Sequence, residues 1–192
     1  MVLILFAASG LRAGERFGLE VQHFLGNAVQ VQQSVWSGNI QTPKTKSAYR
    51  IVELHSSVAA MLHNFIGDRK EGFIFAARNG SSLRQSNFLR RALHPILKAL
   101  GIEKQGLHGL RRYRVTHLES SSVPQALIDY WTGHAKKSDG ENIPKTMNQI
   151  YTKMDKDTAF RQEVAERIGI GFELPKPVVP GVPRNVVGVA FS

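Results

Sequence analysis

The residues with the most distinctive chemistry in this sequence are an imidazole and a guanidinium in the segment His108-Gly109-Leu110-Arg111. On a helix, residues three positions apart project from the same face, so both side chains could meet one ligand. A guanidinium presents a planar fork of N–H donors that matches phosphate oxygens, and an imidazole can donate a hydrogen bond or move a proton. The pair alone is weak evidence for a functional site, because the solvated face of any basic helix can carry a histidine and an arginine at the same spacing.

Four further segments stand in a fixed order around this pair. They are Ser9-Gly10-Leu11-Arg12-Ala13-Gly14-Glu15, Thr42-Pro43-Lys44-Thr45-Lys46-Ser47, Gly133-His134 and Ile150-Tyr151-Thr152. Their order resembles that of the tyrosine recombinase (phage integrase) family, whose elements are a Gly-Leu-Arg segment, a strand-loop lysine, His-x-x-Arg, a Gly-His pair and a tyrosine nucleophile. The resemblance runs from about residue 3 to residue 165.

The resemblance implies a role for each matched residue. The two family arginines correspond to Arg12 and Arg111, the two imidazole positions to His108 and His134, and the nucleophile to Tyr151. For the lysine, the register of the following strand favours Lys44, with Lys46 as the alternative. The resemblance also implies a mechanism without metal or cofactor, double-stranded DNA as partner, and a homotetramer assembled on that DNA.

These residue types suit phosphodiester transfer. The transition state carries negative charge on its non-bridging oxygens, and two arginine forks supply fixed donors to them. A phenol with an ordinary pKa of about 10 needs a base or a positive field, and His108 is the candidate for that help. A loop lysine can protonate the departing 5′-hydroxyl, and His134 is expected to donate a hydrogen bond to the phosphate.

Each assignment has a simpler alternative. Arg12 could pair with Glu15 or Glu20 on a surface helix, Tyr151 could be an ordinary half-buried tyrosine, and a strand-loop lysine is usually solvated. We interpret Glu15 as a structural residue that holds Arg12.

Two features depart from the family pattern. The interval from His134 to Tyr151 is longer than usual, and the polar stretch 137–144 would account for the excess as a surface insertion. This leaves open whether Tyr151 acts in cis or in trans. Family members also have an N-terminal DNA-clamping domain, which we expect to be absent here, so whether the truncated chain is active alone is also open.

The chemical segments need elements to position them, and the resemblance implies a mainly α fold with a small three-stranded antiparallel β-sheet (α+β), the fold of the integrase catalytic domain. Apolar periodicity and Gly and Pro breaks predict these elements: helix, turn and helix over 1–19 with a break at Ser9-Gly10, strands within 28–54, and helices from Ser56 to Gly67, over 82–100 despite Pro95, over 108–120, from Pro124 to Trp131, and over 155–168. We expect residues 1–168 to form the catalytic domain and residues 169–192 a Pro-rich C-terminal tail.

The composition fits one compact domain with a polyanionic partner. The chain has 192 residues, 42% of them hydrophobic, and a formal net charge of +10. It has no cysteine, which excludes disulfides and cysteine metal sites. The apolar opening, residues 1–8, is too short to span a membrane, and we expect a cytoplasmic protein of bacterial or phage origin, associated with the nucleoid.

The sequence therefore predicts a site-specific DNA recombinase that forms a 3′-phosphotyrosine intermediate. The alternatives are a non-catalytic DNA-binding remnant of a recombinase and an enzyme similar to type IB topoisomerases.

Overall fold

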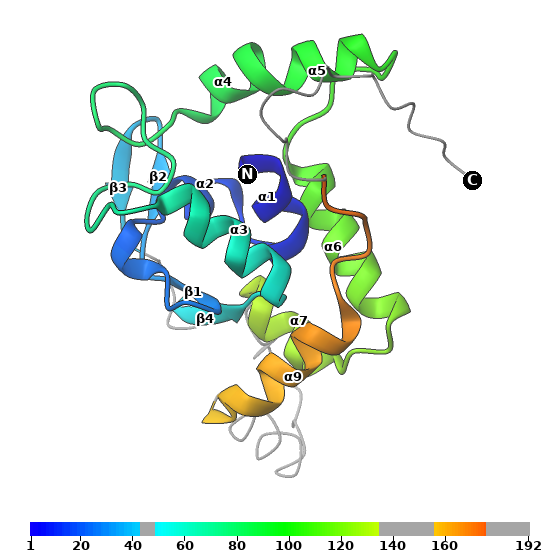
Figure 1. Cartoon of the computed structure of the whole chain (residues 1–192). Coiled ribbons are helices and arrows are strands. Elements are labelled where there is room, and N and C mark those ends of the chain that lie inside the picture. The colour runs from blue at the N-terminus through cyan, green and yellow to red at the C-terminus, as the bar shows by residue number, and fades with distance from the viewer. Residues whose placement is uncertain (43–48, 135–155, 176–192) are drawn as a thin grey trace, which may run out of the picture.

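A computed structural model describes residues 1–42, 49–134 and 156–175 of the chain. The described part is mostly helical with small antiparallel sheets, which confirms the predicted fold class (Figure 1). The helical elements are α1 (Val2–Ser9), α2 (Ala13–Phe17), η1 (Val21–His23), α3 (Ser56–Ile66), α4 (Gln85–Phe88), η3 (Leu89–Leu93), α5 (His94–Ala99), α6 (His108–Ser120), α7 (Gln125–Thr132) and α9 (Thr158–Ile168). The strands are β1 (Ala28–Val31), β2 (Ser34–Trp36), β3 (Asn39–Gln41) and β4 (Arg50–Glu53).

Helix α1 lies in the middle of the molecule, between α2, α3 and α6 (Figure 1). Its sequence is almost entirely apolar, and Leu5 and Phe6 are fully buried. Gly10 ends the helix with φ +67°, a conformation that glycine adopts without the steric cost of a Cβ. The break predicted at Ser9-Gly10 is therefore confirmed, and it places Arg12 directly after the central helix.

The strands pair differently from the single three-stranded sheet that we expected. Among the described residues, β1 pairs with β4, and β2 pairs with β3, as two separate antiparallel ribbons. The chain leaves the first ribbon at Gln33, whose side-chain amide donates to the Gly18 carbonyl and to the Glu20 carboxylate, both at 2.8 Å. These bonds hold Gln33 against the α2–η1 segment, and pairing resumes only at Ser34.

The helix expected over 82–100 is present from Gln85 to Ala99 but contains a π-helical turn, η3, just before Pro95. Proline lacks a backbone N–H, and its ring crowds the carbonyl four residues earlier in an α-helix. The wider turn accommodates this residue without ending the helical run, as π-bulges do elsewhere. None of the helices in the described ranges has the length and apolar character needed to cross a membrane.

Strand β4 anchors α7 and α9 through buried polar contacts. The Trp131 indole donates to the Glu53 carboxylate at 2.7 Å, and Arg161 Nε donates to its other oxygen at 2.9 Å. Helix α9 begins at Thr158, where Asp157 caps it by accepting from the Phe160 amide. The predicted start of this helix, residue 155, lies outside the described residues.

Residues 169–175, which the sequence assigned to the tail, contact the core. Ile170 is buried, Gly169 accepts a hydrogen bond from Arg114 Nη1 at 2.9 Å, and Phe172 packs on the Tyr113 ring. This segment runs back along α6 (Figure 1). Packed structure therefore continues at least to Leu174.

Candidate active site

Arg12 begins α2 and reaches a second segment distant in sequence. As the N-cap residue it shares a capping box with Glu15, whose carboxylate accepts from the Arg12 amide at 2.8 Å. Arg12 Nη1 donates to Glu15 Oε1 at 3.0 Å, and Nη2 donates to the Gly133 carbonyl at 2.9 Å. Its side chain is still 46% exposed. The guanidinium therefore has both a fixed position and open access from solvent.

Arg111 projects from the first turn of α6 into the gap between the ends of α1 and α7. Nη1 donates to the Gly10 carbonyl at 2.6 Å, and Nη2 donates to the Thr132 carbonyl at 2.9 Å. Burial, followed by the charge of Arg12, lowers the pKa of Arg111 to about 10. The group stays cationic at neutral pH, in a place where water cannot screen it well.

His134 follows the turn that ends α7 and lies against Arg111. Its Nε2 is 3.0 Å from Arg111 Nη2, and its Nδ1 is 3.8 Å from a carboxylate oxygen of Asp129. Because a guanidinium only donates, Nε2 is the acceptor in this contact and the neutral ring holds its proton on Nδ1. Burial and then Arg111 lower the pKa of His134, whereas Asp129 raises it, and the net direction is downward. The neutral ring is therefore the resting form.

A buried carboxylate joins these parts. Glu15 accepts from Arg12 and also from Arg50, whose Nη2 lies 2.9 Å from Oε2. Burial raises the pKa of Glu15, but the hydrogen bonds and charges of Arg50 and Arg12 outweigh it and the net pKa is lowered. The contact with Arg12 agrees with our interpretation of Glu15 as the residue that holds it.

The cluster combines three guanidinium groups, those of Arg12, Arg50 and Arg111, with the single carboxylate of Glu15. Such a surplus of positive charge attracts an anion and repels a metal cation. Among the described residues, no group of three or more His, Asp or Glu side chains is placed to hold a metal ion. The remaining N–H donors of Arg12 have no partner in the described part of the chain, so an anion with several oxygens can bind there.

Comparison with known proteins identifies the family. The family model described as "Phage integrase family" matches residues 1–157. The chain belongs to the phage integrase family.

One curated member with similarity to this chain is a tyrosine recombinase XerC-like protein of Caldanaerobacter subterraneus subsp. tengcongensis, 26% identical over 172 residues that cover 74% of this chain and 44% of the relative. The chain thus spans less than half the length of that relative. Solved structures give the same fold. The Tn1549 transposon integrase in complex with circular intermediate DNA is 18% identical with a TM-score of 0.60, and the matched region covers 80% of this chain and 58% of the integrase chain. The integrase from mycobacterium phage Brujita is 18% identical with a TM-score of 0.58, and the matched region covers 91% of this chain and 53% of the phage integrase chain.

The structure brings together three of the six candidate residues of this integrase-family chain: Arg12, Arg111 and His134. His108 is exposed at the first residue of α6, one turn before Arg111, and it makes no hydrogen bond or ion pair with any described residue. Lys44, its alternative Lys46, and Tyr151 lie outside the described residues.

Arg50 is the residue of the cluster that the sequence analysis missed. It opens β4, is 4% exposed, and bonds to Glu15 with both terminal nitrogens. One signal was present: an arginine in a short apolar strand, Arg50-Ile51-Val52, has to be either exposed or paired with a buried acid. The acid is 35 residues away in sequence, so spacing alone could not identify the pair.

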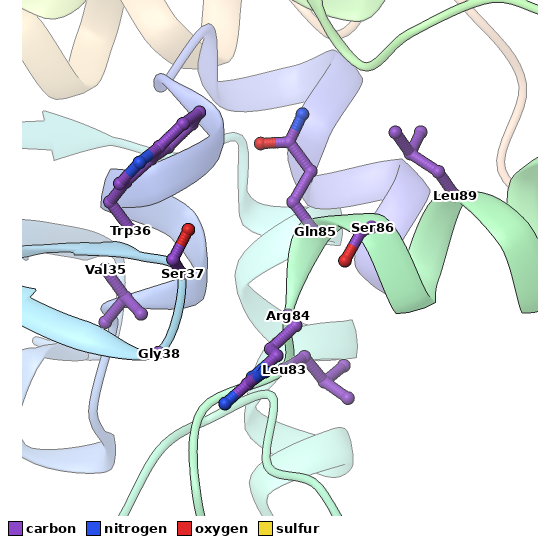
Figure 2. Close-up of a pocket in the computed structure, with 9 residues that line it drawn as sticks. All are labelled: Val35, Trp36, Ser37, Gly38, Leu83, Arg84, Gln85, Ser86 and Leu89. Carbon is purple, nitrogen blue, oxygen red and sulfur yellow. The ribbon is translucent and has the colours of Figure 1, made fainter.

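A pocket lies apart from the cluster, between the β2–β3 turn and the start of α4 (Figure 2). Its volume is about 310 Å³, and its lining includes Trp36, Gly38, Arg84 and Gln85. The Trp36 side chain is 64% exposed, and Arg84 lies beside Gly38. None of the lining residues is a candidate catalytic residue, so the pocket adds nothing to the arginine cluster.

Proposed function

We propose that the chain is the catalytic domain of a site-specific DNA recombinase that cleaves and rejoins strands through a 3′-phosphotyrosine at Tyr151. The observation that carries the proposal is the convergence of Arg12, Arg111 and His134 from three separate segments onto one cationic site. Membership of the phage integrase family supports the same reaction.

The site suits the charge that develops during strand cleavage. Arg111 is held by the carbonyls of Gly10 and Thr132, and Arg12 by Glu15 and Gly133, so neither side chain has to reorganise when negative charge builds on the phosphate. Donors fixed in advance in a poorly hydrated site are the most effective form of electrostatic stabilisation.

The proposed reaction exchanges one phosphodiester for another. A bond forms between the Tyr151 oxygen and phosphorus, and the bond from phosphorus to the 5′-oxygen breaks. The phenol proton passes to a base, for which His108 is the candidate, and the leaving 5′-oxygen takes a proton from Lys44 or Lys46. Attack by the 5′-hydroxyl of a second strand reverses the step, so no external energy source is required.

Double-stranded DNA is the proposed partner, and a homotetramer on DNA the proposed assembly. The Tn1549 integrase, which shares the fold, was solved with circular intermediate DNA. The formal charge of +10 of this chain suits the same kind of ligand.

The decisive experiment traps the covalent intermediate on a nicked duplex whose cleaved fragment diffuses away. The probe is a library of such duplexes with a randomised centre, incubated with the full chain and chelator and resolved on a denaturing gel. We expect a slow-migrating adduct from wild type and none from Tyr151→Phe. Tyr113→Phe is the matched control, because it removes the hydrogen bond from the Tyr113 hydroxyl to the Ile170 carbonyl at 3.4 Å and keeps the ring that packs against Phe172, so the variant should keep the adduct.

Two results would contradict the proposal. An adduct that persists in Tyr151→Phe would show that another residue attacks the phosphate. Binding without any adduct from wild type would favour a non-catalytic DNA-binding remnant.

A further inference from the structure

Arg50 makes more polar contacts within the arginine cluster than a simple ion pair requires. Its Nη1 and Nη2 donate to the two oxygens of Glu15 at 3.2 and 2.9 Å, a bidentate arrangement. Its Nε donates to the Trp131 carbonyl at 2.8 Å, in the last turn of α7. One buried side chain therefore connects β4 to the start of α2 and to the end of α7.

Both ends of these contacts lead to candidate catalytic residues. Glu15 Oε1 accepts from Arg50 and from Arg12, so Arg50 fixes the carboxylate and the carboxylate in turn fixes Arg12. The Trp131 carbonyl lies just before Gly133 and His134, and Arg50 is packed so closely there that a Cβ on Gly133 would be 2.7 Å from its Nη1.

The same strand carries a second buried pair that serves as an internal comparison. At the other end of β4, Glu53 accepts from Arg161 Nε at 2.9 Å, and both side chains are almost fully buried. Glu53 also accepts from the Trp131 indole, and the Arg161 guanidinium lies over the Tyr130 ring. Arg50 in β4 and Arg161 in α9 are thus both buried and both paired with a carboxylate, but Glu15 also accepts from Arg12, whereas Glu53 also accepts from the Trp131 indole.

Burying Arg50 also has an electrostatic cost. Its charge lies close enough to Arg111 to contribute to lowering the pKa of that residue. A third guanidinium next to two others opposes folding through repulsion. Stabilisation of the fold alone is therefore a poor explanation for an arginine at this position.

We propose that Arg50 is a positioning residue for strand cleavage. Through Glu15 it fixes the Arg12 guanidinium, and through the Trp131 carbonyl it fixes the turn that carries His134. The inference rests on the proposed function, because strand cleavage is the reaction that this positioning would serve.

The test compares Arg50→Met and Arg50→Lys with Arg161→Met and Arg161→Lys in the full chain. We expect Arg50→Met to slow adduct formation at saturating DNA by roughly 100-fold with little change in DNA affinity, because a displacement of about 1 Å at a reacting centre can have an effect of that size. Arg161→Met should lose thermal stability but keep the cleavage rate within about 3-fold of wild type. Arg50→Lys, which retains charge but not the fork, should be intermediate.

A double-variant cycle separates positioning from general stability. If Arg50 acts through Arg12, then Arg12→Ala combined with Arg50→Met should be little slower than Arg12→Ala alone. Multiplied losses, or equal losses from Arg50→Met and Arg161→Met, would overturn the inference.

A readout independent of cleavage distinguishes this inference from the proposed function. The imidazole NMR signals and pKa of His134 should change in Arg50→Lys and stay unchanged in Arg161→Lys. If wild type forms no adduct, the proposed function fails, while a selective change at His134 still supports the positioning contacts. Unchanged His134 signals in Arg50→Lys would contradict them.

Discussion

At the scale of single residues, Arg12 and Arg111 have the same charge but different environments. Replacing them should therefore have different effects on stability. Arg12 is half exposed, whereas Arg111 is buried and satisfies two carbonyls. Replacement of either by Ala should slow adduct formation by roughly 100-fold or more with a smaller effect on DNA binding. Only Arg111→Ala should also lower the free energy of unfolding, by about 1–3 kcal/mol, because it leaves buried carbonyls unpaired. Single-turnover cleavage, binding and urea unfolding measure the three quantities. Equal losses of binding and cleavage would assign these arginines to docking.

Gly133 is constrained by its backbone and by its surroundings. Its φ is +64°, and an added Cβ would lie 2.7 Å from Arg50 Nη1 and 3.2 Å from Arg12 Nη1. Gly133→Ala should therefore destabilise the fold and displace the arginines, with loss of cleavage beyond the loss of stability. Gly101→Ala is the matched control, because Gly101 has φ +69° and open space around it. We expect Gly101→Ala to cost about 1 kcal/mol in urea unfolding and to leave cleavage intact. Similar cleavage rates in the two variants would contradict the crowding at Gly133.

The lowered pKa of His134 predicts a dependence of stability on pH. Since the folded state holds the ring neutral more strongly than the unfolded state does, its contribution is present above the unfolded pKa of about 6.5 and is lost as the pH falls through the folded value. His134→Gln should flatten part of this acid-side loss in the melting temperature. His23, whose pKa burial also lowers, should supply a separate part that His134→Gln leaves unchanged. A wild-type melting temperature that does not change between pH 7.5 and 5.5 would contradict both assignments.

The sequence order predicted a site containing Arg12, Arg111 and His134, but it also predicted His108 there, which makes no hydrogen bond or ion pair with a described residue. It did not predict which residues hold the site together. Arg12, Arg111 and His134 lie in short recognisable segments, and the structure brings them together. Arg114 shows the opposite case. It lies in the same basic helical segment as Arg111 and Arg112, yet it is buried and donates to the Gly169 carbonyl. Spacing along a helix gives the face of a residue, and that face becomes buried or exposed only through its tertiary neighbours.

At the scale of elements, helix limits were easier to predict than strand pairing. Gly10, Gly67 and Gly133 end helices as predicted, because each has a positive φ that favours glycine. The sheets differ because Gln33 binds to the α2–η1 segment, a contact between separate elements that alternation in the strand does not reveal. The packed segment after α9 was missed for a related reason, since Pro-rich composition hid the apolar contacts of Ile170 and Phe172.

The packed segment 169–175 predicts that the stability of a truncated chain depends sharply on whether the chain ends before or after it. A chain ending at Ile168 loses the burial of Ile170 and leaves the Arg114 guanidinium without its Gly169 acceptor. We expect it to be destabilised by about 2–4 kcal/mol in urea unfolding, from apolar burial and the unpaired donor together. A chain ending at Pro175 retains these contacts and should unfold like the full chain. Equal stability of the two truncated chains would show that residues 169–175 do not contribute to the core.

At the scale of the whole molecule, the formal charge of +10 overstates the cationic surface. Five arginines of the described ranges are buried: Arg16, Arg50, Arg111, Arg114 and Arg161. Their positive charge is used internally, on carbonyls, on carboxylates and over the Phe6 ring. Direct contacts with the phosphates of duplex DNA must come instead from exposed residues such as Arg90, Arg91 and Arg112.

This division predicts how salt should affect DNA binding. Affinity for duplex DNA should fall with a log–log slope of several units, because each bound cationic side chain releases counterions from the phosphates. Arg112 and Arg114 lie two positions apart on α6, one exposed and one buried, and form a matched pair. Arg112→Ala should reduce the slope by about 1, whereas Arg114→Ala should leave the slope unchanged and lower the melting temperature. Binding measured over a range of salt concentrations, beside thermal unfolding of both variants, decides the matter. A slope that falls in Arg114→Ala and not in Arg112→Ala would mean that α6 presents its other face to DNA.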